Sequence, residues 1–476
     1  MNEPTMSDAT PPPPGEPGTS RSGTLSLEGL NSTVPIPPET AGFWKQYRAF
    51  VGPAFLVSVG YMDPGNWGTD LDAGAKYKFD LLWVVALSSF MAIVMQVCSA
   101  RLGIVTGKDL AQACRDHLPG WTRYPNWVAC ELAIAACDLA EVLGSAVALN
   151  LLFGIPIFWA VLITALDVLL ILALQGFGVR FIEAVILTLV ATIGGCYFVE
   201  IFVLPQTTPN FLEMGSALLS PGFRQEGMVV GAIGIIGATV MPHNLYLHSA
   251  LVRTRQLGTD ESALRRAIKF NTLDTVGALS LAFFVNAAIL VLAATTFYGR
   301  EGATLASGEV VSFGEDADWI RVAYLTLTPL LGASAASALF AVALLASGQS
   351  STITGTLAGQ VVMEGFLHWR TSPWVRRIIT RLLAIVPAVV VIGARGGGSV
   401  TDLLVLSQVV LAMQLPLAMF PLLYFTSSKR IMGDFRNGWF LLAVGWASCL
   451  LITALDLYGL PGSLEKAWVV IVGKAE

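Results

Sequence analysis

Two stretches of the sequence place a proline among potential metal ligands in the middle of a long apolar run. The first reads Gly60-Tyr-Met-Asp-Pro-Gly-Asn66 and the second reads Gly237-Ala-Thr-Val-Met-Pro-His-Asn244. A proline in mid-helix removes one hydrogen bond and clashes with the preceding turn, so each stretch predicts a broken helix. Unwound backbone at membrane depth exposes carbonyl groups that need partners. A bound cation would satisfy them.

The side chains at the two breaks favour a divalent transition metal as that cation. Asp63 offers a carboxylate, Asn66 an amide oxygen and Met241 a thioether, and the carbonyls of Gly60 and Ala238 add oxygen donors. Oxygen donors alone suit Mg²⁺ or Ca²⁺, whereas a sulfur donor favours Mn²⁺, Fe²⁺, Cd²⁺ and similar ions. Met241 would therefore discriminate against alkaline-earth ions. The alternative is that both prolines only kink packed helices and that Met241 fills space.

Three acidic residues, Glu131, Asp138 and Glu141, lie inside one apolar run. Their spacings of seven and three residues place them along one face of a helix. Ionisable groups in spanning helices are costly and usually functional, so this face predicts a polar lane. His243 titrates near neutral pH and would exchange a proton with Asp63.

Counter-charges for this lane would come from the start of the ninth apolar run, which carries Arg376, Arg377 and Arg381. The alternative for the acids is a set of buried structural ion pairs. The alternative for His243 is a histidine that packs between helices.

The composition indicates an integral membrane protein. Hydrophobic residues make up 54% of the chain and charged residues only 13%, whereas about a quarter of an ordinary soluble domain is charged. The net charge of -5, with basic residues dispersed, argues against a nucleic-acid partner. The six cysteines lack CxxC spacing, which argues against a disulfide framework and a zinc site.

Apolar runs separated by polar residues predict eleven membrane spans, the first and sixth of which are broken. They cover approximately residues 49–75, 81–104, 125–152, 155–175, 181–203, 228–252, 273–298, 331–366, 378–394, 402–425 and 438–458. Breaks five spans apart predict two repeats of five, residues 49–203 and 228–425, followed by an extra helix at 438–458. Residues 1–44 are rich in Pro, Gly, Ser and Thr and predict a disordered tail before a transporter domain over 45–476.

The distribution of basic residues predicts the orientation. Short cytoplasmic loops keep Lys and Arg, and an N-terminus on the inside places twenty of the 28 basic residues there and eight outside. We therefore expect a cytoplasmic N-terminus and an extracytoplasmic C-terminus in the cell membrane. The tail lacks the pattern of a cleaved signal peptide, so the first span is expected to remain.

The stretch Asp63-Pro64-Gly65-Asn66, the pattern Ala238-x-x-Met241-Pro242-His243 and the eleven-span layout resemble the natural resistance-associated macrophage protein (Nramp) family of metal transporters, bacterial MntH type. The resemblance extends from about residue 45 to 458. It implies an all-α LeuT-type membrane fold of two inverted repeats. It also implies proton-coupled import of Mn²⁺, Fe²⁺ and ions such as Cd²⁺ and Co²⁺ by alternating access, without a permanent cofactor. The sequence leaves the oligomeric state open, and we expect a monomer.

The resemblance further implies roles for individual residues. The implied metal site comprises Asp63, Asn66, Ala238, Met241, Gly60 and Gln408. The implied proton pathway comprises Asp63, His243, Glu131, Asp138 and Glu141, with Arg376 and Arg377 on the exit side. Gly60 departs from a frequent alanine but keeps its carbonyl. Relatives specialised for Mg²⁺ or Al³⁺ change the methionine position, so Met241 argues against both.

Three other functions stay open at this point. A carrier of amino acids or other organic solutes on the same scaffold would present a free helix N-terminus to a substrate carboxylate. A membrane-embedded enzyme would use Asp63 or His243, although the sequence shows no nucleophile paired with a base. A passive channel would carry ions without any effect of pH.

Overall fold

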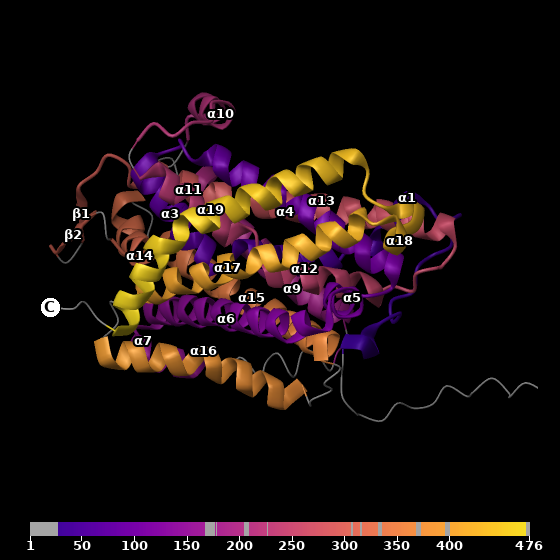
Figure 1. Cartoon of the computed structure of the whole chain (residues 1–476). Helices are drawn as coiled ribbons and strands as arrows, with labels where there is room; N and C mark the ends of the chain where they lie inside the picture. Colours follow the sequence, from indigo (N-terminus) through magenta and orange to yellow (C-terminus); the bar gives the residue numbers. More distant parts are fainter. Residues whose placement is uncertain are drawn as a thin grey trace, which may run out of the picture.

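The structure, a computed structural model, is a bundle of long helices (Figure 1). It describes residues 27–166, 177, 179–203, 209–225, 227–305, 308–314, 317–331, 336–367, 373–395 and 400–472. Helices α1, α5 and α18 gather at one end of the bundle, which we call the α1 end. The hairpin β1–β2 and helix α14 lie at the opposite end.

The elements follow one another along the chain with these bounds. The first half contains η1 (Leu27–Leu30), α1 (Phe43–Phe50), α2 (Pro53–Ser58), η2 (Val59–Met62), α3 (Pro64–Tyr77), α4 (Leu82–Thr106), α5 (Leu110–His117), η3 (Gly120–Thr122), α6 (Arg123–Phe153), α7 (Ile157–Thr164), α9 (Val179–Phe198), η4 (Val199–Val203) and α10 (Phe211–Leu219). The second half contains α11 (Met228–Thr239), α12 (Pro242–Leu251), η6 (Val252–Thr254), α13 (Glu261–Thr296), β1 (Gly302–Thr304), β2 (Val310–Ser312), α14 (Trp319–Leu331), α15 (Ala336–Leu367), α16 (Pro373–Arg395), α17 (Val400–Ser427), α18 (Lys429–Met432), η8 (Gly433–Phe435) and α19 (Trp439–Val472).

Many of these helices can cross a membrane. Within the described ranges, eight helical segments have the length and composition of a membrane span, and two shorter apolar helices cover Pro53–Met62 and Ile378–Gly393. The all-α membrane class expected from the sequence is therefore confirmed, whereas the count of eleven spans stays a prediction. Nine of the 21 residues of the expected fourth span, residues 167–175, lie outside the described residues, and helix α7 ends before them at Thr164.

Several element boundaries differ from the expected ones. Helix α13 begins at Glu261, twelve residues before the expected span, because the Asp260 carboxylate accepts a hydrogen bond from the Ala263 N–H and caps a charged first turn. Helix α19 continues to Val472, past the expected end at residue 458. The apolar-run criterion locates membrane segments and does not detect a polar extension such as the start of α13.

Both predicted breaks are present. The first lies between η2 and α3, where Asp63 is extended with φ -70° and ψ 166°, and Pro64 occupies the first turn of α3. The second lies between α11 and α12, where Val240 and Met241 are extended and Pro242 begins α12. Proline at the first helical position has no N–H that would need a partner there. Each proline therefore starts a new half-helix, as the sequence predicts.

The last part of the predicted disordered tail lies against the helical body. The Ser32 N–H donates to the Arg253 carbonyl at 3.0 Å, and the Val34 N–H donates to the Thr254 carbonyl at 2.9 Å. Val34 is buried, and Ile36 packs on an apolar cluster that includes Phe50. The predicted tail boundary at residue 44 is therefore too late, because these two apolar side chains anchor the segment. The rest of the predicted tail, residues 1–26, lies outside the described residues.

Close helix packing in the centre depends on glycines. Helices α3 and α13 approach so closely at Gly74 that a Cβ atom there would lie 2.2 Å from the Leu290 carbonyl oxygen. A Cβ at Gly144 of α6 would lie 2.3 Å from Pro64 at the first break. These contacts fix the half-helix α3, and with it the first break, against the neighbouring spans.

We predict that Gly74→Ala destabilises the protein and that Gly68→Ala does not. The added methyl at position 74 would have to displace backbone of α13, and overpacking of this kind costs about 1–3 kcal/mol. Gly68 lies in the same helix, and a methyl group there would have nothing within 4 Å, so alanine should stabilise by about 0.5–1 kcal/mol. Thermal unfolding of both variants in detergent measures the difference, and equal melting temperatures would contradict the packing.

Candidate functional site

The first break places a buried carboxylate at its centre. Asp63 is fully buried and caps α3, because its Oδ1 accepts a hydrogen bond from the Asn66 N–H at 2.9 Å. Its Oδ2 has no hydrogen-bond partner among the described residues. One oxygen therefore holds the local fold while the other is available to a ligand.

The carbonyl groups exposed by this break are largely satisfied by side chains. The Tyr61 carbonyl accepts from Asn66 Nδ2 at 2.5 Å and from Asn286 Nδ2 at 2.8 Å. The Met62 carbonyl accepts from Ser347 Oγ at 2.5 Å and from Trp67 Nε1 at 3.1 Å. Because the Asn66 amide group donates to the backbone, its Oδ1 points elsewhere, and it has no partner in the described part of the chain.

The second break contributes a thioether and further buried polar groups. Ala238 and Met241 are fully buried, and Met241 is the extended residue that precedes α12. His243 and Asn244 follow in the first turn of α12 and are also buried. Neither side-chain atom of Asn244 has a described partner, and the same holds for His243 Nδ1.

Glycines bring the two breaks into contact with each other and with α17. A Cβ atom at Gly60 would lie 2.2 Å from Asn244 Nδ2, so the second break packs directly on the first. A Cβ atom at Gly65 would lie 2.2 Å from Gln408 Nε2, which places the predicted Gln408 beside the same break. Gln408 Oε1 also lacks a described partner.

The two breaks and α17 bring together buried oxygen atoms that have no hydrogen-bond partner among the described residues. Asp63 Oδ2, Asn66 Oδ1 and Gln408 Oε1 are buried acceptors, and each such group left unsatisfied costs about 1–3 kcal/mol or more. In the described part of the chain, no three His, Cys, Asp or Glu side chains form a group that could hold a metal ion. A cation here would therefore be held by one carboxylate, amide oxygens, carbonyls and the Met241 thioether. Such a mixed, weakly charged set suits an ion that must leave again.

The predicted acidic lane lies on α6, and among the described side chains Arg381 supplies a counter-charge to it. Asp138 and Arg381 are both buried and form an ion pair between α6 and α16. Arg381 also donates from Nη2 to the Thr164 carbonyl of α7 at 2.8 Å. The side chains of Arg376 and Arg377, predicted to share this role, lie outside the described residues.

The other two acids occupy different environments along the same helix. Glu141 is buried and accepts a hydrogen bond from the Cys137 thiol, with 3.3 Å between Sγ and Oε1. Glu131 is half-buried near the start of α6, where Trp127 Nε1 donates to its Oε1 at 3.1 Å. The lane therefore runs from the middle of the bundle, next to the breaks, toward the α1 end.

A second polar chain, which the sequence did not indicate, lies below the breaks toward the α1 end. Gln96 of α4 donates from Nε2 to the Tyr61 hydroxyl at 2.7 Å, and its Oε1 lies 2.9 Å from His248 Nδ1. All three side chains are buried. They connect η2, α4 and α12, so they tie both broken helices to an unbroken one.

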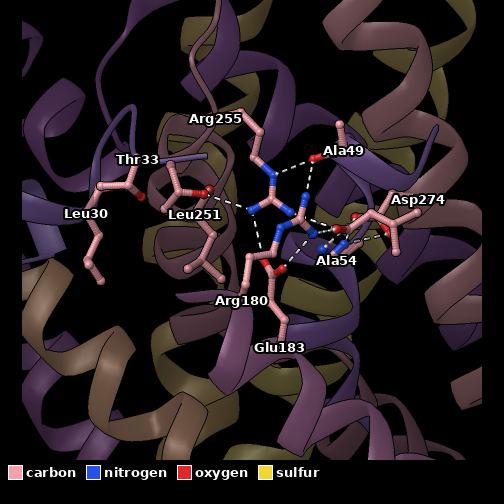
Figure 2. A network of polar contacts seen from close by, with 12 residues as sticks. Leu30, Thr33, Ala49, Ala54, Arg180, Glu183, Leu251, Arg255 and Asp274 are labelled. Atoms are coloured by element: carbon pink, nitrogen blue, oxygen red, sulfur yellow. Dashed lines mark hydrogen bonds and ion pairs between the residues drawn. The ribbon is translucent and has the colours of Figure 1, made fainter. Parts of the chain in front are cut away.

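Buried charges hold the α1 end together (Figure 2). Arg255, only 1% exposed, pairs with Glu183 of α9 at 2.8 Å and donates from Nη2 to the Val51 carbonyl at 2.7 Å. Arg180 pairs with Glu183 at 2.9 Å and donates to the Ala49 and Val51 carbonyls, both at 2.7 Å. Arg180 and Arg255 thus cap the carbonyl end of α1. We call Arg180, Glu183, Arg255 and Asp274 together the latch.

Asp274 of α13 binds the other side of the junction between α1 and α2, which we call the hinge. Its carboxylate accepts hydrogen bonds from the Ala54 N–H at 3.0 Å and from the Gly52 N–H at 3.3 Å, which caps α2. Gly52 has φ +137° and lies so close to Glu183 that a Cβ atom would be 2.3 Å from its Cδ. The latch therefore fixes α2, the half-helix that precedes the first break, to α9, η6 and α13.

A third group of charges lies beside the latch, outside the membrane spans. Asp109 caps α5 and pairs with Arg253 at 3.2 Å. Burial raises the pKa of the Asp109 carboxyl to about 6, although the Gln112 N–H and the Arg253 guanidinium act in the opposite direction. The strap of residues 32–34 is bonded to the same η6 segment, so the end of the second broken helix is held from two sides.

Comparisons with known proteins agree over most of the chain. A family model described as natural resistance-associated macrophage protein-like matches residues 54–461. The chain is 49% identical to a divalent metal cation transporter MntH of Nostoc sp., covering 93% of this chain and 96% of that protein. It is 50% identical to a protein of the same name from Bradyrhizobium diazoefficiens, covering 91% and 93%. A crystal structure of a mutant manganese transporter from Eremococcus coleocola superposes with a TM-score of 0.84 at 38% identity, covering 95% and 93%.

We predict that Arg255→Gln loosens the hinge between α1 and α2. The substitution leaves Glu183 with one arginine fewer and removes one of the two arginines that donate to the Val51 carbonyl, so α2 should detach more often. Hydrogen–deuterium exchange of the Gly52 and Ala54 amides should accelerate by about tenfold or more, the equivalent of one lost charged hydrogen bond.

The matched control for this prediction is Arg265→Gln. Arg265 lies at the same end of the molecule, but its ion pair with Glu261 is exposed and within one helix. Its loss should leave the exchange of Gly52 and Ala54 unchanged. Equal exchange rates in the Arg255→Gln variant and the unmodified protein would show that the latch does not hold α2.

Proposed function

Because the chain belongs to the natural resistance-associated macrophage protein-like family, we propose that it imports divalent transition-metal ions across a membrane by alternating access. The cargo would bind between the two broken helices. The observation that supports this proposal best is the set of buried acceptor atoms without partners at Asp63, Asn66 and Gln408. A divalent cation would satisfy them together.

The proposed cargo site combines hard and soft donors. Asp63 Oδ2 supplies the negative charge, and Asn66 Oδ1 and the carbonyls of Ala238 and Gly60 supply neutral oxygens. Met241 adds a thioether that favours Mn²⁺ or Fe²⁺ over Mg²⁺ and Ca²⁺. Gln408 would close the site from α17, since it already packs on Gly65.

We assign proton coupling to the α6 lane and to Asp63. The Asp138–Arg381 ion pair connects α6 to α16, and Glu141 and His243 lie between that pair and the breaks. A proton displaced from Asp63 by the metal would pass by His243 and Glu141 toward the α1 end. Arg381 would take the part in this path that the sequence analysis assigned to Arg376 and Arg377.

The latch would be the inner gate of the cycle. The α1 end carries the excess of basic residues, so it is assigned to the cytoplasmic side, with the C-terminus on the other side. In the present structure α2 is held there by the latch and by the chain Tyr61, Gln96 and His248. Release of α2 from both would open a path from Asp63 to the cytoplasm.

The geometry favours this function over an organic-solute carrier. Such a carrier would present a free half-helix N-terminus to a substrate carboxylate. Here the N-terminus of α3 is capped by Asp63 itself, and a second carboxylate would meet its negative charge. The proposal therefore includes neither an amino-acid substrate nor an enzymatic reaction.

We predict that Mn²⁺ uptake into proteoliposomes requires Asp63 and that Met241 sets its selectivity. Asp63→Ala removes the only charged donor of the site and should abolish uptake. Met241→Ala should retain uptake but let excess Mg²⁺ or Ca²⁺ compete, with at least about a tenfold lower concentration needed for inhibition. Radioactive or fluorescent assays of Mn²⁺ entry measure both effects.

The controls are Asp434→Ala and Met413→Ala. Asp434 is exposed in η8, and Met413 is 50% exposed on α17, so both should behave like the unmodified protein. Normal Mn²⁺ uptake by Asp63→Ala would mean that the cargo site lies elsewhere.

We also predict that Asp138 couples uptake to the proton gradient. An Asp138→Asn variant alone leaves Arg381 buried without its partner and risks misfolding. The double variant Asp138→Asn with Arg381→Gln removes both charges, so it should fold and bind Mn²⁺. Its uptake should no longer increase when the outside is made acidic.

If the pair were only structural, the double variant would keep the full stimulation by an acidic outside. Glu261→Gln, which removes an exposed carboxylate at the start of α13, serves as the control and should keep it. The comparison separates a proton-carrying carboxylate from an ion pair that only joins α6 to α16.

A further inference from the structure

A thiol and an imidazole from two different helices meet beside the proposed cargo site. Cys137 Sγ of α6 lies 3.7 Å from His243 Nε2 of α12, and both residues are buried. The same thiol donates a hydrogen bond to Glu141 Oε1 at 3.3 Å. Neither the cargo site nor the proton path proposed for this chain uses the thiol.

The spacing of the two donor atoms fits a tetrahedral metal ion. Zinc bonds of about 2.3 Å to sulfur and 2.0–2.1 Å to nitrogen place two ligands of one ion roughly 3.5 Å apart. The separation of 3.7 Å between Cys137 Sγ and His243 Nε2 is close to that value. Thiolate and imidazole are also the donor types that zinc and other thiophilic ions prefer.

We propose that Cys137 and His243 form a second metal site, which captures thiophilic divalent cations such as Zn²⁺ and thereby inhibits transport. The proposal rests on the proposed function only for its effect on uptake, since binding itself needs no transport. Two protein ligands leave the other positions of the ion to water, in keeping with the lack of a group of three His, Cys, Asp or Glu ligands in the described chain.

The binding step balances in charge and protons. The Cys137 thiol loses its proton as the sulfur–zinc bond forms, and the proton passes to the Glu141 carboxylate, to which the thiol already donates. The zinc ion binds the thiolate through sulfur and the neutral imidazole through Nε2. Glu141 is thus the proton acceptor of the step and not a ligand.

Inhibition follows from the position of the site. His243 is two residues from Met241 in the second break, and Cys137 is one residue from Asp138 in the α6 lane. Two turns further along α6, a Cβ atom at Gly144 would lie 2.3 Å from Pro64, the residue that follows Asp63. An ion held there would join α6 to α12 and place positive charge beside the cargo carboxylate, which opposes both Mn²⁺ binding and relative motion of the two helices.

The experiment measures inhibition of Mn²⁺ uptake by Zn²⁺ in proteoliposomes. Cys137→Ser should raise the Zn²⁺ concentration that halves uptake by at least about tenfold, because a thiolate ligand is replaced by a hydroxyl. Cys130→Ser is the matched control. It changes a buried cysteine two turns earlier on α6, whose sulfur contacts Gln414, and should leave zinc inhibition unchanged.

Direct binding of Zn²⁺ to purified protein keeps the proposal testable if a variant does not transport. Equilibrium dialysis should show one tight Zn²⁺ equivalent in the unmodified protein and in Met241→Ala, and its loss in Cys137→Ser and Cys137→Ala. If the unmodified protein failed to take up Mn²⁺, the proposed function would be overturned. The zinc-binding measurement would still test the second metal site by itself. Equal zinc binding with and without Cys137 would mean that the thiol only packs against Ala133 and Leu411, and the second site would be refuted.

Discussion

The structure depends on how two interrupted helices satisfy their polar groups inside an apolar bundle. At the first break, Asn286 of α13 and Ser347 of α15 donate to the carbonyls of Tyr61 and Met62. With these carbonyls satisfied, Asp63 Oδ2 and Asn66 Oδ1 are left without a partner among the described residues. The polar groups of the surrounding helices thus help to stabilise the break. In the proposed function, a cargo ion would complete an arrangement that is otherwise costly.

A related constraint explains why buried charges accompany the apolar packing at the α1 end. Interlocking apolar side chains resist separation, whereas hydrogen bonds between charged groups can be exchanged for water when an interface opens. The latch, which includes Asp274, holds α2 through backbone atoms on both sides of Gly52. Because Gly52 adopts φ +137°, a side chain at this position would be strained as well as crowded. The hinge of the first broken helix is therefore defined by backbone and charge.

The breaks could be predicted because a proline interrupts a helix at its own position. The membrane class could be predicted because the length of each apolar run can be read directly along the chain. Partners distant in the chain were harder to predict. The choice of Arg381 as the partner of Asp138 depends on how α16 packs on α6, which spacing along the chain does not reveal. The contact between His248 and Gln96 was not predicted, because the two residues are 152 positions apart in the chain. The strap at Val34 was missed because two apolar residues in a Pro-rich segment carry no periodic signal.

The roles proposed for Met241 and Cys137 would explain why a transporter for soft cations needs weak sulfur ligands. A thioether stays neutral and releases its ion without a proton, so it adds selectivity with little effect on the rate of release. A thiolate binds more tightly, and its ion leaves only when a proton returns to sulfur. The Cys137 thiol donates its proton to Glu141, within 3.7 Å of an imidazole and beside the route of the cargo. The same bundle would therefore release an ion that is held by the thioether and retain one that is held by the thiolate. Its cargo would then be limited by the rate of release as well as by affinity.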